Sequence, residues 1–392
     1  MSFKLSAVSA AVVLACSMGH AVAADSSYID QSGSNNKASV LQDGNSPNGN
    51  NASTINQSGS DNNAQVQQVG NVDNNVSTII EYSGANSNLS QVYQASNTSA
   101  SASIMNGGSA NLGNISQARV VNASGAIVQS GNSNTGLINQ TDGANQHATI
   151  NASSYGINGD NNYARVGQTG NDQTVSVEQS YGASNQLYAS QSGSNDRATL
   201  SQSRYSNYLN SSQSGTGGLN TVNASQTGDR NTGNITQSGS DLSASLSQPG
   251  SDNTASLSQT GSSSTMTVAQ RGNGNNGSAT QSGISQYASL DQGGNANKAT
   301  LSQAGGSNTL YASQGGGSNQ GDLSQNGFFN SGNLTQSGSF NKASMDQVGG
   351  SNNASLLQSG NSNSATISQS GNYFTSNNSQ GGSGNIITVT QR

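Results

Sequence analysis

The chain has 392 residues, of which 30% are hydrophobic and only 7% are charged, and it contains no tryptophan. This composition excludes a conventional core of large apolar side chains, and the shortage of proline and charge also separates the chain from typical disordered proteins. Polar, nearly uncharged sequences that are poor in proline can form cross-β structure. The net charge of −6 disfavours nucleic acid and anionic membranes as partners.

Residues 1–23 have the features of a secretory signal peptide. A lysine near the start precedes an apolar run over residues 5–16, and Ala-Val-Ala at 21–23 forms a small-x-small cleavage signal. We expect the mature chain to begin at Ala24 or Asp25. Beyond this leader, no apolar stretch approaches the roughly 20 residues of a membrane-spanning helix.

The single cysteine, Cys16, lies inside the leader. Its surroundings loosely resemble a bacterial lipoprotein box, although a bulky leucine stands where a small residue is usual. Two interpretations follow: an ordinary apolar leader residue, or a lipidated cysteine at the start of an anchored protein. In the first case the mature chain has no cysteine, and its stability in an oxidising compartment does not come from disulfides.

Residues 24–225 carry an eleven-residue repeat with interruptions. Glutamines are spaced by eleven from Gln31 to Gln42 and from Gln57 to Gln68, whereas other steps are longer. Glu81 and Asn106 stand where the pattern calls for glutamine. Insertions in repeat proteins usually fall in loops, so we expect the extra residues to enlarge turns without interrupting a continuous stack.

Residues 226–392 follow the repeat strictly. Sixteen glutamines stand at steps of eleven, which excludes chance as an explanation. These predicted ladder glutamines are Gln226, Gln237, Gln248, Gln259, Gln270, Gln281, Gln292, Gln303, Gln314, Gln325, Gln336, Gln347, Gln358, Gln369, Gln380 and Gln391.

Each glutamine begins a unit of the form Q-x-G-x-x-N-x-A-x-φ-x-Q, in which φ is a large apolar residue. The glycine is present in all fifteen units, and we expect it to provide the positive backbone φ of a tight turn. Asparagine follows three residues later in eleven of them. These predicted ladder asparagines are Asn231, Asn253, Asn275, Asn297, Asn308, Asn319, Asn330, Asn341, Asn352, Asn363 and Asn385.

The alternation within each unit predicts one β-strand and one turn. Asparagine, alanine, the apolar residue and glutamine lie on one side of the strand, and Ser, Thr, Lys and Asp lie on the other. Two units make a 22-residue strand-turn-strand rung that encloses a thin interior. The sequence therefore predicts an all-β, two-sided β-solenoid that becomes cross-β amyloid on polymerisation.

Stacked rungs place each glutamine over another and each asparagine over another, so their side-chain amides are expected to donate and accept along the axis. The repeats begin soon after the leader and continue to the last residue, and no capping segment is visible. An end that pairs with the opposite end of the next copy gives a filament. We therefore expect the chain to polymerise with itself.

The unit resembles the curlin repeat of bacterial surface amyloids, as residues 336–347, QSGSFNKASMDQ, illustrate. The resemblance implies an extracellular fibre of the biofilm matrix that serves adhesion, with a nucleating subunit, an outer-membrane export channel and matrix polysaccharide as partners. The chain departs from the family in its number of repeats and in its short segment between the leader and the first repeat. Acidic turn residues, such as Asp61, Asp196 and Asp252, would act as gatekeepers that slow assembly, or simply follow the turn preference of aspartate.

Catalytic, cofactor-binding and metal-binding sites are not expected. The chain beyond the leader has one histidine, His147, and two glutamates, Glu81 and Glu178, too few reactive groups for an active site. His147 is interpreted as a solvent-facing strand residue. Two other functions stay open: a monomeric surface adhesin or ligand-binding solenoid, and a minor nucleating subunit of the same fibre.

Overall fold

The computed structural model describes residues 12–14, 25–44, 50–70, 72–152, 160–215 and 217–392. These residues form 33 β-strands and no helix, and the chain divides into two compact units, unit 1 (Met1–Ser194) and unit 2 (Asn195–Arg392). Most of the expected signal peptide at 1–23, including Cys16, lies outside the described residues. Only Val12–Leu14 of that segment is described, as a short strand β1 that pairs with β3.

Unit 1 contains two sheets, one formed by the odd-numbered strands and one by the even-numbered strands. The odd-numbered strands are β1 (Val12–Leu14), β3 (Lys37–Gly44), β5 (Asn63–Gly70), β7 (Leu89–Ala95), β9 (Leu112–Val121), β11 (Thr135–Ala144), β13 (Tyr163–Asn171) and β15 (Gln186–Ser194). The even-numbered strands are β2 (Ser26–Gln31), β4 (Ala52–Gln57), β6 (Val76–Glu81), β8 (Ser101–Asn106), β10 (Ser124–Gln129), β12 (His147–Ala152) and β14 (Thr174–Ser180).

Unit 2 has the same arrangement. Its odd-numbered strands are β17 (Tyr208–Gly215), β19 (Thr232–Ser240), β21 (Thr254–Ser262), β23 (Asn276–Ile284), β25 (Lys298–Gly306), β27 (Gln320–Phe328), β29 (Lys342–Gly350), β31 (Ser364–Asn372) and β33 (Ile386–Gln391). Its even-numbered strands are β16 (Arg197–Ser203), β18 (Thr221–Gln226), β20 (Ser243–Gln248), β22 (Thr265–Gln270), β24 (Tyr287–Gln292), β26 (Thr309–Gln314), β28 (Ser331–Ser339), β30 (Asn353–Asn361) and β32 (Thr375–Gln380).

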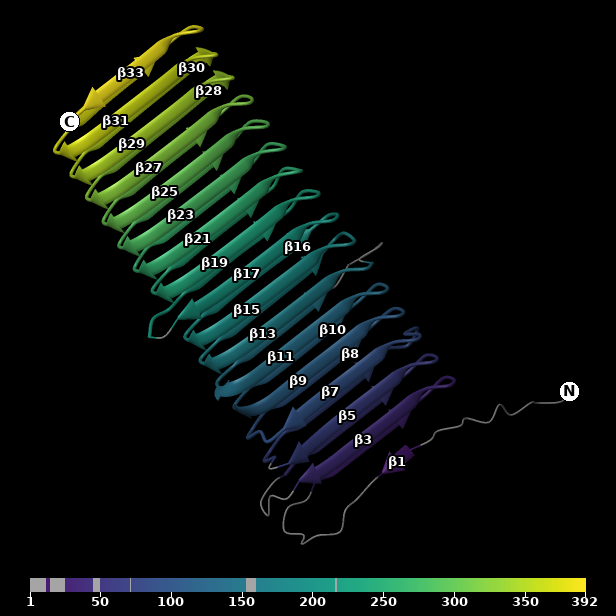
Figure 1. Ribbon diagram of the computed structural model, residues 1–392. Coiled ribbons are helices and arrows are strands. Elements are labelled where there is room, and N and C mark those ends of the chain that lie inside the picture. The colour runs from purple at the N-terminus through teal and green to yellow at the C-terminus, as the bar shows by residue number, and fades with distance from the viewer. Residues whose placement is uncertain (1–11, 15–24, 45–49, 71, 153–159, 216) are drawn as a thin grey trace, which may run out of the picture. The chain divides into compact units, whose positions relative to one another are not determined.

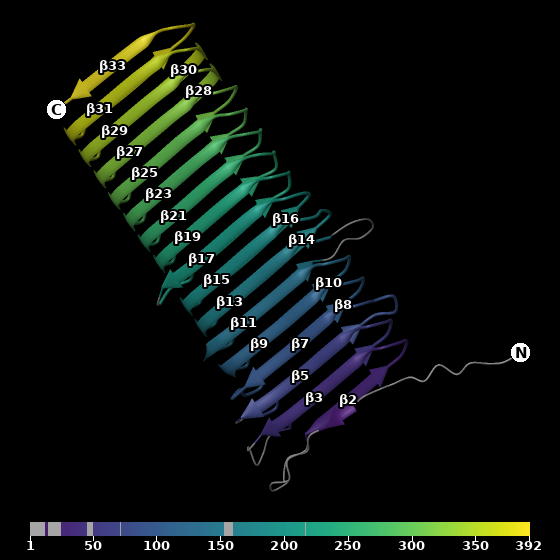
Figure 2. The ribbon, with the colours of Figure 1, turned by 45° about the vertical axis from the view of Figure 1, so that its right-hand side comes forward.

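Within each unit, strands that are two places apart in the chain pair in parallel. In unit 2, β25 pairs with β27 so that Gln303 lies beside Gln325, 22 residues on. Consecutive strands belong to opposite sheets and run in opposite directions, as the arrows within each unit show (Figure 1 and Figure 2). One strand from each sheet and the two turns that join them form a rung, which confirms the predicted two-sided β-solenoid with 22-residue rungs.

The core of each unit lies between its two sheets and follows the alternation of the sequence. In β20, for example, Ala244, Leu246 and Gln248 are buried, and the serines between them face outwards. The largest fully buried side chains are isoleucines and leucines, most of them at the apolar position, such as Ile127 in unit 1 and Ile235 in unit 2. Small residues fill the neighbouring position because the interior between the sheets is thin.

Unit 1 keeps its register despite irregular spacing. The glutamine-to-glutamine step between neighbouring strands of one sheet is 26 residues from Gln42 to Gln68 and 28 residues from Gln140 to Gln168. The strands nevertheless align glutamine with glutamine. Residues 45–49, between β3 and β4, and residues 153–159, between β12 and β13, lie outside the described residues, so the expected enlargement of these turns stays a prediction. Glu81 pairs with Gln57 and Asn106 pairs with Glu81, which confirms that both stand in a glutamine position.

The repeat glycine has two structural reasons for its identity. Eleven of the fifteen, Gly338 among them with φ of 98°, have a positive φ as expected. The other four, Gly228, Gly250, Gly272 and Gly294, do not. At these four positions a Cβ atom would lie 1.7 to 1.8 Å from the carbonyl oxygen of the glycine in the next rung. Close approach of two backbones, and not φ, excludes a side chain there.

Candidate functional site: ladders of side-chain amides

The glutamines of unit 2 form two rows of hydrogen bonds in its interior. In one row the Nε2 atom of Gln226 donates to Oε1 of Gln248 at 2.8 Å, and the same bond recurs at every rung to Gln380, at 2.7 to 2.9 Å. The other row runs from Gln237 to Gln391 at 2.7 to 2.9 Å. The structure thus brings all sixteen predicted ladder glutamines together. Fifteen are buried, and Gln391 is half-buried.

Both rows donate in one direction, towards higher residue numbers. The orientation of the amides is fixed by a second contact, because most of the same Nε2 atoms also donate to a backbone carbonyl of the facing strand. Gln248 Nε2, for example, donates to Thr232 O at 3.2 Å. Only the nitrogen of the amide can make that bond. Each rung therefore presents acceptors to the preceding rung and donors to the following one.

The asparagines lie in the turns and bond differently from the prediction. In unit 2 the Oδ1 atom of Asn231 accepts the backbone N–H of Asn253 at 3.0 Å, and Asn231 Nδ2 donates to Gly250 O at 2.7 Å. Among the predicted ladder asparagines, two side-chain amides bond directly at two steps: Asn341 Nδ2 donates to Asn319 Oδ1, and Asn385 Nδ2 donates to Asn363 Oδ1. Asparagine is one methylene shorter than glutamine, so its amide stays beside the turn backbone and satisfies the groups there.

The predicted asparagine positions are occupied as follows. Asn231, Asn253, Asn275, Asn297, Asn319, Asn341, Asn363 and Asn385 lie in successive rungs on one edge of unit 2 and are linked Oδ1 to backbone N. Asn308, Asn330 and Asn352 lie on the other edge. All except Asn385 are buried.

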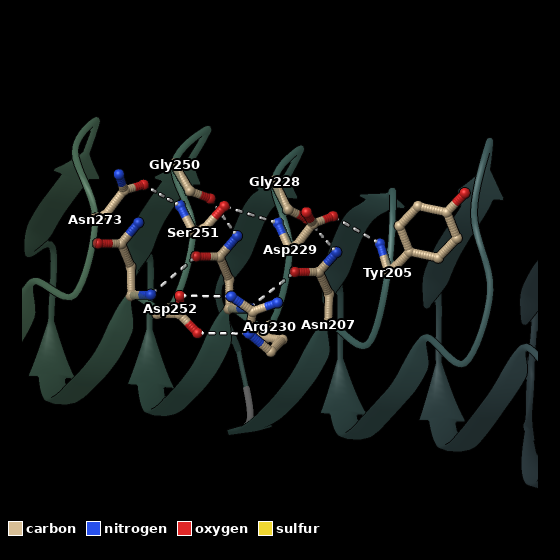
Figure 3. A network of polar contacts seen from close by, with 11 residues as sticks. Tyr205, Asn207, Gly228, Asp229, Arg230, Gly250, Ser251, Asp252 and Asn273 are labelled. Atoms are coloured by element: carbon tan, nitrogen blue, oxygen red, sulfur yellow. Dashed lines mark hydrogen bonds and ion pairs between the residues drawn. The ribbon is translucent and has the colours of Figure 1, made fainter.

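Charged side chains in the turns link neighbouring rungs on the outside. In unit 2, Arg230 donates to both carboxylate oxygens of Asp252 at 2.7 and 2.8 Å (Figure 3). Arg119 and Asp142 make the same bidentate pair in unit 1. In both pairs the arginine lowers the pKa of the aspartate. All four residues have positive φ, so the turn has a second left-handed position, which sequence reasoning missed.

The polar contacts of this turn continue through several rungs. Asp229 Oδ1 accepts the N–H of Tyr205 at 3.2 Å, and Asn273 Oδ1 accepts the N–H of Ser251 at 2.9 Å (Figure 3). Each turn side chain therefore supports the backbone of the rung before it. A signal for the pairs was present in the sequence, since Arg230 and Asp252 are separated by 22 residues, one full rung.

Asp196 differs from the other acidic turn residues. Its side chain is buried in an asparagine position of unit 2, where Oδ1 accepts a hydrogen bond of 2.9 Å from Asn220 Nδ2. Burial raises the pKa of Asp196 to about 6. Asp61 and Asp252, in contrast, are turn residues with positive φ, as the sequence indicates.

The remaining candidate groups are dispersed. His147 is exposed on β12, where its Nδ1 lies 2.7 Å from Ser124 Oγ, which confirms the solvent-facing interpretation. Within the part of the chain that the structure describes, no three His, Cys, Asp or Glu side chains are placed to hold a metal ion. The same residues include no helix that is long and apolar enough to span a membrane.

Fold and interior together define a class of protein: a β-solenoid whose core is built from rows of side-chain amides. The family model of the curlin associated repeat matches the chain at residues 158–180, 220–250, 228–261 and 341–371. The chain therefore carries curlin associated repeats at these places, as the sequence resemblance implied. A comparison with curated proteins gives no match. Curlin repeats on a β-solenoid fit a curli-like structural subunit.

Proposed function

We propose that the chain is the structural subunit of an extracellular, curli-like amyloid fibre, and that it assembles by stacking the rungs of one copy on the rungs of the next. The observation that carries this proposal is the equivalence of the rungs in unit 2. Each rung offers the next one the same backbone groups, two glutamine amides and, on one edge, an asparagine amide, in the same register. A rung from a second copy would meet the same set.

The one-way hydrogen bonding of the glutamine rows supports a head-to-tail arrangement. Donors face one way and acceptors the other, so two copies with the same polarity complement each other, whereas copies of opposite polarity oppose donor to donor. The side chains of β33 are the ones that such a contact would cover. Ile387 and Val389 are half-buried, while Ala365 and Ile367, their partners on β31, are buried.

Assembly of the purified full-length protein tests the proposal, with thioflavin T fluorescence and electron microscopy as readouts. Val389→Asp places a charge on the inward side of β33, and Thr388→Asp places one on its outward side, where the residue is exposed. We expect the first variant to slow or abolish fibre growth, because a buried unpaired charge is costly, and the second to assemble like the wild type. Equal growth of both variants would contradict stacking through this surface.

The family implies further roles that belong to this proposal: a place in the biofilm matrix outside the cell, a contribution to adhesion, and partnership with a nucleating subunit, an export channel and matrix polysaccharide. The chain acts in this account as a scaffold without catalytic activity. Deleting the gene and scoring matrix fibres and surface attachment would test the cellular part separately from self-stacking in vitro.

A second candidate function, a ligand-binding surface, is favoured by exposed aromatic residues in turns of unit 2. Phe329 and Tyr373 both have positive φ, which is unusual for bulky residues, and both are well exposed, as is Phe328. Replacing the three by serine distinguishes the functions. Loss of surface attachment with unchanged fibre growth would assign these residues to adhesion, and loss of fibre growth would assign them to assembly.

A further inference from the structure

Unit 1 also contains two interior rows of glutamine positions, and one of them is continuous. From Gln42 to Gln191, each Nε2 donates to the Oε1 of the next glutamine in the same sheet, at 2.8 to 3.0 Å. Gln117 Nε2 also donates to Ser101 O at 2.9 Å, which fixes the orientation of its amide. This row donates towards higher residue numbers, as the rows of unit 2 do.

In the other row the direction of donation reverses at Glu81. Gln57 Nε2 donates to Glu81 Oε2 at 2.9 Å from the preceding rung, as the pattern requires. Ser90 Oγ donates to Glu81 Oε1 at 2.8 Å, and Asn106 Nδ2 donates to Ser90 Oγ at 2.8 Å. A carboxylate can only accept hydrogen bonds, so donors point at Glu81 from both sides.

The reversal leaves the following rungs with polar atoms that have no partner. Because Asn106 Nδ2 is directed back to Ser90, its Oδ1 atom is left over, and it is buried without a hydrogen-bond partner among the described residues. Gln129 pairs with Asn106 in the next rung, and its Oε1 lacks the donor that Asn106 would supply. Gln129 Nε2 is also unpartnered, for a different reason: the following residue in the row is Ala152, which has no side-chain acceptor. Unpaired buried polar groups lower the stability of the strands that carry them.

The surroundings of Glu81 favour its neutral form. The side chain is 1% exposed, and burial raises its pKa above the ordinary value of 4.5, against the opposing effect of the hydrogen bonds from Ser90 and Gln57. The neighbouring strands β4 and β8 carry no charged side chain. On the facing strand β7 the titratable residue is Tyr93, which is exposed, and Asp61 and Asp73 lie in the turns.

We propose that Glu81 is a protonation switch in the interior of unit 1. When its carboxyl group binds a proton from solvent, it gains one O–H donor, and this donor can serve the unpartnered Oδ1 of Asn106 and restore donation towards higher residue numbers. When the proton leaves, a negative charge is buried beside strands β6, β8 and β10, and the row of side-chain hydrogen bonds is interrupted at Glu81. The inference rests on the hydrogen bonds and the burial of Glu81 within unit 1, and it stands whether or not the chain forms fibres.

The sign of the effect follows from the raised pKa. The folded state binds the proton more tightly than the unfolded state, so the stabilisation is fully present below the ordinary value of 4.5. It is lost as the pH rises through the folded-state value. Acid therefore stabilises β6, β8 and β10, and neutral pH weakens them.

Carbon-13 NMR of the full chain with ¹³C-labelled glutamate carboxyl groups measures the switch directly. The chain contains two glutamates, and the second, Glu178, is exposed on β14. Glu178→Gln removes its signal and so assigns that of Glu81. We expect the signal of Glu81 to titrate above the ordinary value of 4.5. Titration of Glu81 at or below this value would overturn the proposal.

Hydrogen exchange of the backbone amides, corrected for intrinsic rates, tests the consequence for the rungs. In the wild type and in Glu178→Gln, protection in β6, β8 and β10 should fall as pH rises from 4 to 7, by up to about tenfold for each pH unit. The strands β26 and β28 of unit 2 serve as the reference. Glu81→Gln should remove this fall, and an unchanged fall in that variant would overturn the proposal. If Glu81→Gln does not fold, the carbon-13 NMR titration of Glu81 in the wild type still tests the proposal.

Discussion

The Nε2 atom of Gln325 donates a 2.7 Å hydrogen bond to Oε1 of Gln347, the residue that occupies the same place in the next rung. Gln325 in turn accepts from Gln303 at 2.9 Å and donates to Thr309 O at 3.0 Å. One buried amide thus satisfies groups in three strands. This explains how a chain with few large apolar residues builds an ordered interior.

Substitution of a ladder glutamine should destabilise unit 2. Gln325→Leu removes both amide groups and leaves Gln303 Nε2 and Gln347 Oε1 unpaired, at a cost of about 1–3 kcal/mol for each buried group. The matched control is Gln320→Leu on the same strand, where the side chain is half-buried on the outer face. Guanidinium unfolding of the soluble chain measures both. Equal losses of unfolding free energy would contradict the importance of the ladder.

The alternation of inward and outward residues can be tested at two adjacent leucines of β30. Leu356 is 1% exposed, and Leu357 is 43% exposed. Leu356→Ala should lower the free energy of unfolding by about 2–5 kcal/mol, because it opens a cavity. Leu357→Ala should change it by no more than about 0.5 kcal/mol. The reverse order would show that the register of β30 is wrong.

The repeat glycine can be tested at Gly338. A Cβ atom there would lie 2.0 Å from Gly360 O, and φ is 98°, so Gly338→Ala should cost more than the roughly 1–2 kcal/mol of a left-handed conformation alone. At Gly315 the nearest atom to such a Cβ is 3.9 Å away, and φ is not positive. Gly315→Ala is therefore the control, and thermal unfolding should show little change.

Asp196 should make unit 2 sensitive to pH. Burial raises its pKa from 3.8 to about 6, so its contribution to stability is fully present below pH 3.8 and is lost as pH rises through about 6. Asp196→Asn should therefore raise the melting temperature at pH 7.5 and have little effect at pH 3.5. A variant that melts at the wild-type temperature at both pH values would contradict this prediction.

The architecture was predictable from sequence because the same eleven-residue period determines both the length of a rung and which residues face inwards. The step of eleven between Gln226 and Gln391 fixed the rung length, and the alternation around residues such as Leu301 and Ser302 assigned inside and outside. Each residue of the unit has the same surroundings in every rung, so local pattern and global fold agree. The glycine was also predictable, although four of the fifteen are required by close backbone approach and not by φ.

The features that were not predicted from sequence involve residues that depart from the repeat or that bond to residues of a neighbouring rung. The bonding of Asn231 depends on the exact position of turn carbonyls, which the spacing alone does not give. The burial of Asp196 was missed because aspartate usually marks an exposed turn. The reversal at Glu81 requires Ser90 on the facing strand, and only the three-dimensional structure brings these two residues together.

The central claim is that copies of this chain stack rung on rung, and fibre diffraction of the assembled wild-type protein tests it most directly. The account predicts unbranched fibres with a meridional reflection near 4.8 Å, the spacing of hydrogen-bonded strands along the fibre axis. A protein that remains a soluble, β-rich monomer at high concentration, or fibres without this meridional reflection, would contradict it.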